Sequence, residues 1–224
     1  MRRPLPAESE QLLDRGIAQL GIAASAQATQ QLLALLELLQ EWNRTFNLTS
    51  IRDPLAMIPG HLLDSLSVLP NLPAGSLLDL GCGAGFPGLP IAILQPHRPV
   101  TLLDSNQKKT RFVHHAAAQL GLTNCTVIHS RVEQFTPPAR FANVICRAYS
   151  ALNDFAEQAG RLISDEGALH AMKGQRPTDE INQLADHWRL EACVRLEVPE
   201  TNSTRHLITL RKSAAIPFTA EPDQ

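Results

Sequence analysis

The chain has 224 residues, an apolar fraction of 44% and a net charge of −2, which suits one ordinary domain with an extension or two small domains. No apolar run reaches the roughly 18 residues of a membrane-spanning helix, and the start, MRRPLPAESE, lacks the apolar segment of a secretory signal. The four cysteines are widely spaced, without a C-x-x-C pair, as is typical of free thiols in a reducing compartment. We therefore expect a cytoplasmic protein without a membrane partner, and no feature requires more than a monomer.

The charge is unevenly distributed along the chain. Residues 76–150 carry 7 basic and 3 acidic residues, whereas the first and last thirds are both acidic overall. A local basic field can attract a polyanion. By itself, this small excess is a weak indication of nucleic-acid binding.

The first third of the chain has a helical pattern. Apolar residues recur at steps of three and four between Ala28 and Trp42, which predicts an amphipathic helix. Asp53 and Pro54 predict the N-cap and first residue of a second helix, which would run to Leu69. We therefore expect an N-terminal helical extension over residues 1–75.

From residue 76 onward, short apolar runs alternate with helical stretches. This alternation indicates a Rossmann-like α/β fold, with a doubly wound, mainly parallel sheet over residues 76–212. The link 199–205 is too short for a helix, so the last two strands should form an antiparallel pair at one edge. We expect the tail, residues 213–224, to be disordered. The seven predicted strands are 76–80, 99–104, 125–130, 141–147, 167–173, 190–198 and 206–212, and the predicted helices are 87–95, 106–120, 151–163 and 177–184.

A glycine-rich loop follows the first predicted strand, within the sequence LDLGCGAGFPGLP of residues 78–90. In an open parallel sheet, ligands bind outside the carboxyl ends of the strands. Gly81, Gly83 and Gly85 would permit a tight turn with positive φ and a close approach of the ligand to the backbone. The loop is therefore the predicted cofactor site.

Two classes of ligand use such a loop. Residues 83–88, GAGFPG, fit the G-x-G-x-x-G pattern of an NAD(P)-dependent oxidoreductase. However, the motif lies late after the strand, and the carboxylate of Asp79 is a poor neighbour for a pyrophosphate. S-adenosylmethionine (AdoMet) has no phosphate and carries a sulfonium and an ammonium group. The pattern D-x-G-x-G-x-G over residues 79–85 fits AdoMet better, with Asp104 placed to accept hydrogen bonds from both ribose hydroxyls.

The methyl acceptor is constrained by what the fourth strand lacks. It ends in ICRAYS, residues 145–150, without the N/D-P-P-Y/F box of amine methylation, and Cys146 has the pattern of a buried strand residue rather than of a nucleophile. An acceptor that is already nucleophilic, such as guanine N7, needs only in-line alignment and no covalent enzyme intermediate. Arg131 and Lys173 are at predicted strand ends, and basic side chains there could hold the base.

At this point the sequence resembles the GidB family of ribosomal RNA small subunit methyltransferase G, over roughly residues 30–212. The segments NLTSIRDP, HLLDSL and MKG are more specific to this family than the glycine loop. The matching segments are EWNRTFNLTSIRDP (41–54), HLLDSL (61–66), DLGCGAGFPGLPIAI (79–93), LLDSNQKKTRFV (102–113), SRVEQF (130–135), ICRAYSALND (145–154), MKGQ (172–175) and RHLITLRK (205–212).

The resemblance implies a class I AdoMet-dependent fold and methylation of N7 of guanine 527 of 16S rRNA in the small ribosomal subunit, without a metal. It implies that Arg131 and Arg205 face the RNA or the target base, and we add Lys173 to them as a candidate catalytic residue. A non-catalytic RNA-binding protein of the same fold is an alternative. The cofactor-binding residues that we expect, from the loop or from the resemblance, are Asp79, Gly81, Gly83, Gly85, Phe86, Asp104, Val132, Glu133 and Arg147.

Overall fold

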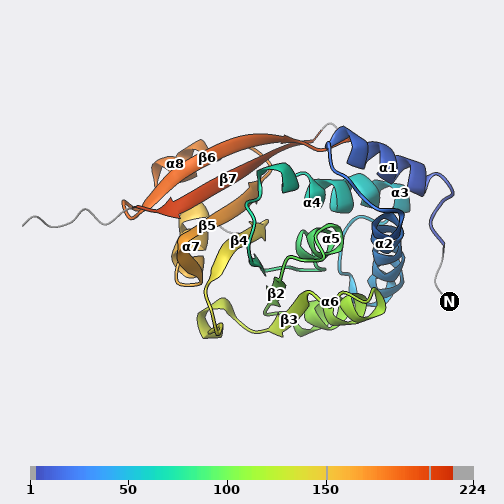
Figure 1. Ribbon diagram of the computed structural model, residues 1–224, viewed down its shortest axis with the longest axis horizontal. Coiled ribbons are helices and arrows are strands. Elements are labelled where there is room, and N and C mark those ends of the chain that lie inside the picture. Colours follow the sequence, from blue (N-terminus) through green and yellow to red (C-terminus); the bar gives the residue numbers. More distant parts are fainter. Residues whose placement is uncertain (1–3, 150, 202, 214–224) are drawn as a thin grey trace, which may run out of the picture.

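A computed structural model describes residues 4–149, 151–201 and 203–213, and its centre is a seven-stranded sheet in the order β3-β2-β1-β4-β5-β7-β6 (Figure 1). Strands β1 to β5 are parallel, and β7 runs antiparallel to both β5 and β6. The predicted α/β fold and its antiparallel edge are confirmed. The strands are β1 (Leu77–Leu80), β2 (Val100–Asp104), β3 (Cys125–His129), β4 (Phe141–Arg147), β5 (Ile163–Lys173), β6 (Trp188–Glu197) and β7 (Thr204–Lys212).

The N-terminal helices follow the predicted pattern with one addition. Asp53 accepts a hydrogen bond from the N–H of Leu55 at 3.2 Å, and Pro54 is the first helical residue, as predicted. A π-helical segment then interrupts the helix, and such segments are frequent at functional sites. The elements are α1 (Ser9–Gln19), α2 (Ala26–Phe46), α3 (Pro54–Met57), the π-helical η1 (Ile58–Leu63), α4 (Asp64–Leu66) and the 3₁₀ turn η2 (Leu69–Asn71).

The largest boundary errors are in the C-terminal half. The helix predicted over 151–163 ends at Ala159, and β5 begins at Ile163 instead of residue 167. Ile163 pairs with Phe141 at the start of β4, whereas Asn143 pairs with Ala168, so the register between the two strands shifts and β5 holds the extra residues. Sequence periodicity gives no sign of such a shift. The helices here are α5 (Gly88–Leu94), α6 (Gln107–Gln119), the 3₁₀ turn η3 (Val132–Gln134), α7 (Leu152–Ala159) and α8 (Thr178–Asn182).

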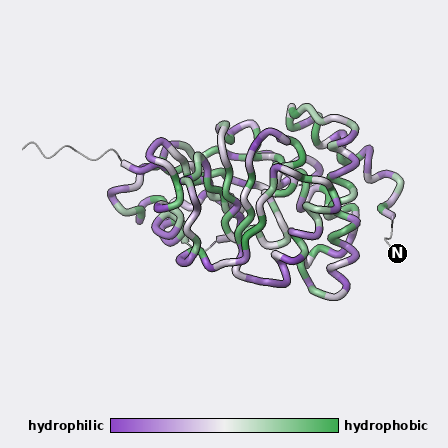
Figure 2. Tube along the Cα trace, turned by 60° about the horizontal axis from the view of Figure 1, so that its bottom comes forward, coloured by the Kyte–Doolittle hydropathy of each residue, from purple (hydrophilic) through white to green (hydrophobic). Residues whose placement is uncertain are grey.

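Two apolar layers cover the sheet, because successive side chains of a strand point to opposite faces. Leu77 belongs to the cluster formed with α1, α2, α5 and α6, whereas Leu78 belongs to the cluster formed with α7. The strands near the centre of Figure 2 are accordingly coloured as largely hydrophobic. Among the described residues, no helix is long and apolar enough to span a membrane.

The domain division at residue 75 stays a prediction. The described N-terminal helices and the sheet contribute to one apolar cluster. Of the predicted tail, Ser213 donates its N–H to the carbonyl of His187 at 2.8 Å, and residues 214–224 lie outside the described part of the chain.

A fully buried histidine links three strands of the sheet. The Nε2 of His170 lies 3.1 Å from Oδ1 of Asn143, and its Nδ1 lies 3.2 Å from the hydroxyl of Thr209. Burial lowers the pKa of His170 from 6.5 to about 4, and the charges of Arg211 and Arg98 act in the same direction. The ring is therefore neutral at pH 7 and serves the structure.

We predict that His170→Gln weakens the acid sensitivity of the fold. Because the folded-state pKa of His170 is lowered, its contribution to stability is present above pH 6.5 and is lost as pH falls toward about 4. Urea unfolding at pH 7 and pH 5 should therefore show a loss of stability that is smaller in the variant by on the order of 2 kcal/mol. The control is His114→Gln, on the exposed face of α6. Equal losses in wild type and His170→Gln would contradict the assignment.

Candidate active site

The glycine loop after β1 has the backbone that the sequence predicts. Gly81, Gly83 and Gly85 have φ values of 72°, 58° and 86°, which L side chains rarely adopt. A Cβ added to Gly83 would meet no atom within 4 Å, so the space next to this residue is open. The loop therefore presents bare backbone to the carboxyl edge of the sheet.

Asp79 supports this loop from inside the protein. Its side chain is fully buried, and Oδ2 accepts a hydrogen bond of 2.7 Å from the N–H of Gly88, the first residue of α5. Its Oδ1 is also buried, and no group in the described part of the chain bonds to it. Burial raises the pKa of Asp79 to about 7, although the Gly88 N–H and the charge of Arg147 act against that shift. Asp79 thus accepts the hydrogen bond of a backbone N–H at a helix N-terminus. In a dinucleotide-binding fold, a pyrophosphate would accept from such N–H groups.

Asp104 fixes the other side of the loop from the end of β2. Its Oδ2 accepts from the N–H of Gly83 at 2.9 Å, and its Oδ1 accepts from the N–H of Asn106 at 2.7 Å. Each carboxylate oxygen can accept more than one hydrogen bond. Asp104 can therefore position the loop and still accept from a pair of ligand hydroxyls.

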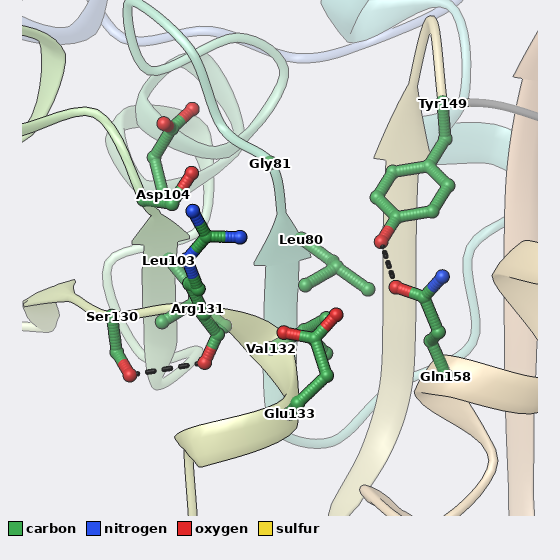
Figure 3. Close-up of a pocket in the computed structure, with 11 residues that line it drawn as sticks. Leu80, Gly81, Leu103, Asp104, Ser130, Arg131, Val132, Glu133, Tyr149 and Gln158 are labelled. Atoms are coloured by element: carbon green, nitrogen blue, oxygen red, sulfur yellow. Dashed lines mark hydrogen bonds between the residues drawn. The ribbon is translucent and has the colours of Figure 1, made fainter.

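A cavity of about 230 Å³ opens at this edge of the sheet (Figure 3). Figure 3 shows Asp104 and Arg131 on one side of the cavity, and Tyr149 and Gln158 on the other. The Tyr149 hydroxyl donates to Gln158 Oε1 at 2.6 Å. The predicted site residues that line the cavity are Gly81, Asp104, Arg131, Val132 and Glu133.

The remaining lining residues were missed from the sequence. Ser105, Ser130 and Tyr149 each lie one or two residues beyond the end of a strand, so the rule that ligands bind at carboxyl ends could have found them. Gln158, on α7, carried no such signal. The others are Leu80 and Leu103.

Seven predicted site residues lie outside the lining of this cavity. Gly83 and Gly85 belong to the loop itself, and Asp79 lies buried behind it. Lys173 ends β5 and pairs with Glu180 at 2.8 Å; Glu180 also accepts from the N–H of Leu152. The other three are Phe86, Arg147 and Arg205.

Asp64, on α4, binds both Arg147 and Arg205. Its Oδ2 accepts from Arg147 at 2.9 Å and its Oδ1 from Arg205 at 2.8 Å, and its side chain is only 3% exposed. Arg147 ends β4, and Arg205 lies at the start of β7, which is antiparallel and so begins at the same edge. One carboxylate of the N-terminal helices thus links two arginines at the carboxyl edge. Sequence reasoning did not single out Asp64, although HLLDSL contains it.

Phe86 lies between this cluster and the N-terminal helices. The guanidinium of Arg147 is 5.6 Å from the centre of the Phe86 ring, and the ring of His61 stacks on Phe86 at 4.8 Å. Nε2 of His61 lies 2.8 Å from the hydroxyl of Thr49. His61 thus connects the N-terminal helices to the loop after β1, and Cys146 is buried in the sheet, as predicted.

Comparisons with known proteins agree with this geometry. Residues 28–208 match the GidB family, rRNA small subunit methyltransferase G. The chain belongs to this family.

Its relatives match over nearly their whole length. The ribosomal RNA small subunit methyltransferase G of Pseudomonas paraeruginosa is 48% identical over 203 residues, covering 90% of this chain and 95% of the relative. The protein of that name from Stutzerimonas stutzeri is 46% identical over 210 residues, covering 93% and 97%.

Solved structures show the fold alone. TrmN from Thermus thermophilus has a TM-score of 0.55 at 19% identity, covering 78% of this chain and 53% of its own. The glycopeptide N-methyltransferase MtfA, complexed with AdoMet, has a TM-score of 0.58 at 10% identity, covering 68% and 95%. The chain therefore has the AdoMet-dependent methyltransferase fold. Membership of the GidB family decides against the NAD(P)-dependent oxidoreductase hypothesis.

We predict that Asp64→Asn destabilises the protein by about 2 kcal/mol, because it leaves two partly buried guanidinium groups without their shared anion. The matched control is Asp165→Asn. Asp165 also contacts two basic residues, Arg140 and Lys212, but its side chain is 87% exposed, so the change should be within about 0.5 kcal/mol. Urea unfolding measures both. Equal losses of stability in the two variants would show that the buried Asp64 contributes no more to stability than an exposed carboxylate does.

Proposed function

We propose that the protein transfers a methyl group from AdoMet to N7 of guanine 527 of 16S rRNA in the small ribosomal subunit. The observation that carries the proposal is the cavity at the carboxyl edge of the sheet, lined by Gly81 of the glycine loop, Asp104 and Arg131, in a chain of the GidB family. The relatives' name, ribosomal RNA small subunit methyltransferase G, supports the RNA class of the substrate.

The residues present fit AdoMet as the methyl donor. Asp104 would accept from the ribose hydroxyls, Val132 and Glu133 would contact the adenine side, and Gly81 would allow the donor to approach the backbone. The buried Oδ1 of Asp79, without a partner among the described residues, favours a cationic ligand behind the loop. When bound, AdoMet supplies a methyl group on a positively charged sulfur. Phe86 and Arg147 would act on this site through the loop.

On the acceptor side, the residues would orient the base and need not move a proton. Guanine N7 has a free lone pair, so the chain must hold it in line with the donated methyl. Arg131 is exposed at the cavity, and its guanidinium has no hydrogen bond or ion pair within the described residues. It is therefore available to bind O6 and N7. Arg205 and Lys173 would contribute positive charge at the same edge, each positioned by its carboxylate partner.

The proposal includes a monomer that acts in the cytoplasm on the small subunit, without a metal. It is tested by mapping 16S rRNA by mass spectrometry from cells with and without this protein. The expected result is one guanine that loses a single methyl group when the protein is absent. Unchanged methylation of 16S rRNA would refute the proposal and favour a non-catalytic RNA-binding protein.

We predict that Arg131→Ala lowers the rate of methyl transfer to small subunits by about 10- to 100-fold, as expected when one bidentate base contact is lost. Its affinity for AdoMet should stay unchanged. The control is Arg140→Ala, whose side chain is 57% exposed and forms an ion pair with the exposed Asp165. Turnover at the wild-type rate in Arg131→Ala would remove this residue from the site.

We predict that Asp104→Asn weakens AdoMet binding by about 2–4 kcal/mol, because a charged acceptor of two hydrogen bonds is lost. Since Asp104 also holds the N–H groups of Gly83 and Asn106, the control is Asn106→Ala. That substitution disturbs the adjacent cap of α6, where the Asn106 side chain accepts from Lys108 and Lys109. Calorimetry that finds wild-type affinity in Asp104→Asn would rule out the ribose contact.

A further inference from the structure

An aromatic side chain is exposed at the end of α2. Among the described residues, the exposed large hydrophobic side chains are Phe46, at 40%, and Leu190, at 36%. Leu190 lies on β6, in the strand pair at the far edge of the sheet, whereas Phe46 is the last residue of α2. Because the Phe46 side chain is 40% exposed, burial in the core does not explain a phenylalanine at this position. A binding role would explain it.

The ring of Phe46 is supported by a short series of aromatic rings. Its centre lies 5.3 Å from that of Trp42, which in turn lies 5.2 Å from His115 and 5.6 Å from Phe112, both on α6. These contacts join α2 to α6 and restrict the orientation of the Phe46 ring. A partly exposed ring held in this way can stack on a flat partner at a small entropic cost.

The contacts between the two helices place Phe46 toward the cavity end of α6. Gln31 of α2 donates to the carbonyl of Leu120 at the end of α6, whereas Trp42, three turns later, contacts the middle of α6, so later turns of α2 meet earlier residues of α6. Phe46, one turn beyond Trp42, therefore lies toward the start of α6. That helix begins two residues after Ser105, which lines the cavity together with Asp104.

The chain segment around Phe46 and the start of α6 are both rich in basic residues. Residues 41–53 and 105–112 carry five basic residues and two acidic ones, Glu41 and Asp53. Within the described residues, none of the five basic groups forms an ion pair, and Arg52 donates only to the neutral oxygens of Asn43 and Asn47. The five basic residues are Arg44, Arg52, Lys108, Lys109 and Arg111.

We propose that Phe46 and these five basic residues, together termed the Phe46 surface, dock single-stranded 16S rRNA next to the cavity. An unpaired base would stack on Phe46 while the basic side chains contact the flanking phosphates. A stacking ring among cations is the usual combination for single-stranded nucleic acids. The inference rests on the proposed function, for which it supplies the missing contact surface outside the cavity.

The test compares Phe46→Ala with Leu190→Ala, which removes the other exposed large hydrophobic side chain. KM for unmethylated small subunits should rise about 10-fold in Phe46→Ala, as expected when one stacked base is lost, while the AdoMet affinity and the thermal unfolding temperature stay unchanged. Leu190→Ala should behave as wild type, and Phe46→Trp should retain the wild-type KM. Reversing the charge of Lys108 and Arg111 together should reduce the salt dependence of RNA binding.

Binding of a naked 16S rRNA fragment, measured without AdoMet, separates this inference from the proposed function. Weaker fragment binding by Phe46→Ala supports the Phe46 surface even if the wild type transfers no methyl group. A wild-type KM in Phe46→Ala would overturn the inference. So would a raised KM with unchanged binding of the naked fragment, which would indicate a ribosomal protein as the partner, or a Phe46-dependent dimer in sedimentation, which would indicate a second copy of the chain.

Discussion

The buried contact between Asp79 and the first N–H of α5 is the constraint on which the site depends. It joins the end of β1 to the start of the following helix, and the glycine loop has to close between them. A carboxylate in this position also fills the helix end with negative charge, at the point where a dinucleotide fold would receive phosphate. A loop that is bare of side chains and backed by a buried carboxyl group, which a nearby positive charge would favour in its ionised form, is suited to a cationic ligand. The raised pKa of Asp79 reflects how strongly burial penalises its charge until such a ligand is near.

The N-terminal helices complete the same edge of the sheet. Their π-helical segment contains His61 and is followed directly by Asp64. Asp64 binds the two arginines Arg147 and Arg205. The ring of His61 stacks on the loop residue Phe86. The site is therefore assembled from both halves of the chain. Positive charge at the edge is fixed by carboxylates that lie beneath or beside it, which suits a protein that must hold a polyanion in one orientation.

Local patterns predicted the parts of the structure that local chemistry determines. Glycines at alternate positions gave the loop with positive φ, and Asp104 was found because it ends a strand. The unpredicted features depend on contacts between distant residues. The role of Asp64 requires Arg205, 141 residues away, and the early start of β5 requires a register shift between β4 and β5. Gln158 enters the cavity only because α7 packs next to β4, and no spacing in the sequence indicates that.

Every role proposed for the site requires the loop after β1 to bind a cationic methyl donor and not a pyrophosphate. Titration calorimetry of the purified chain with AdoMet, and separately with NADH, tests it most directly. We predict saturable binding of AdoMet at one site per chain and no binding of NADH. Saturable binding of NADH together with no heat from AdoMet would contradict the account.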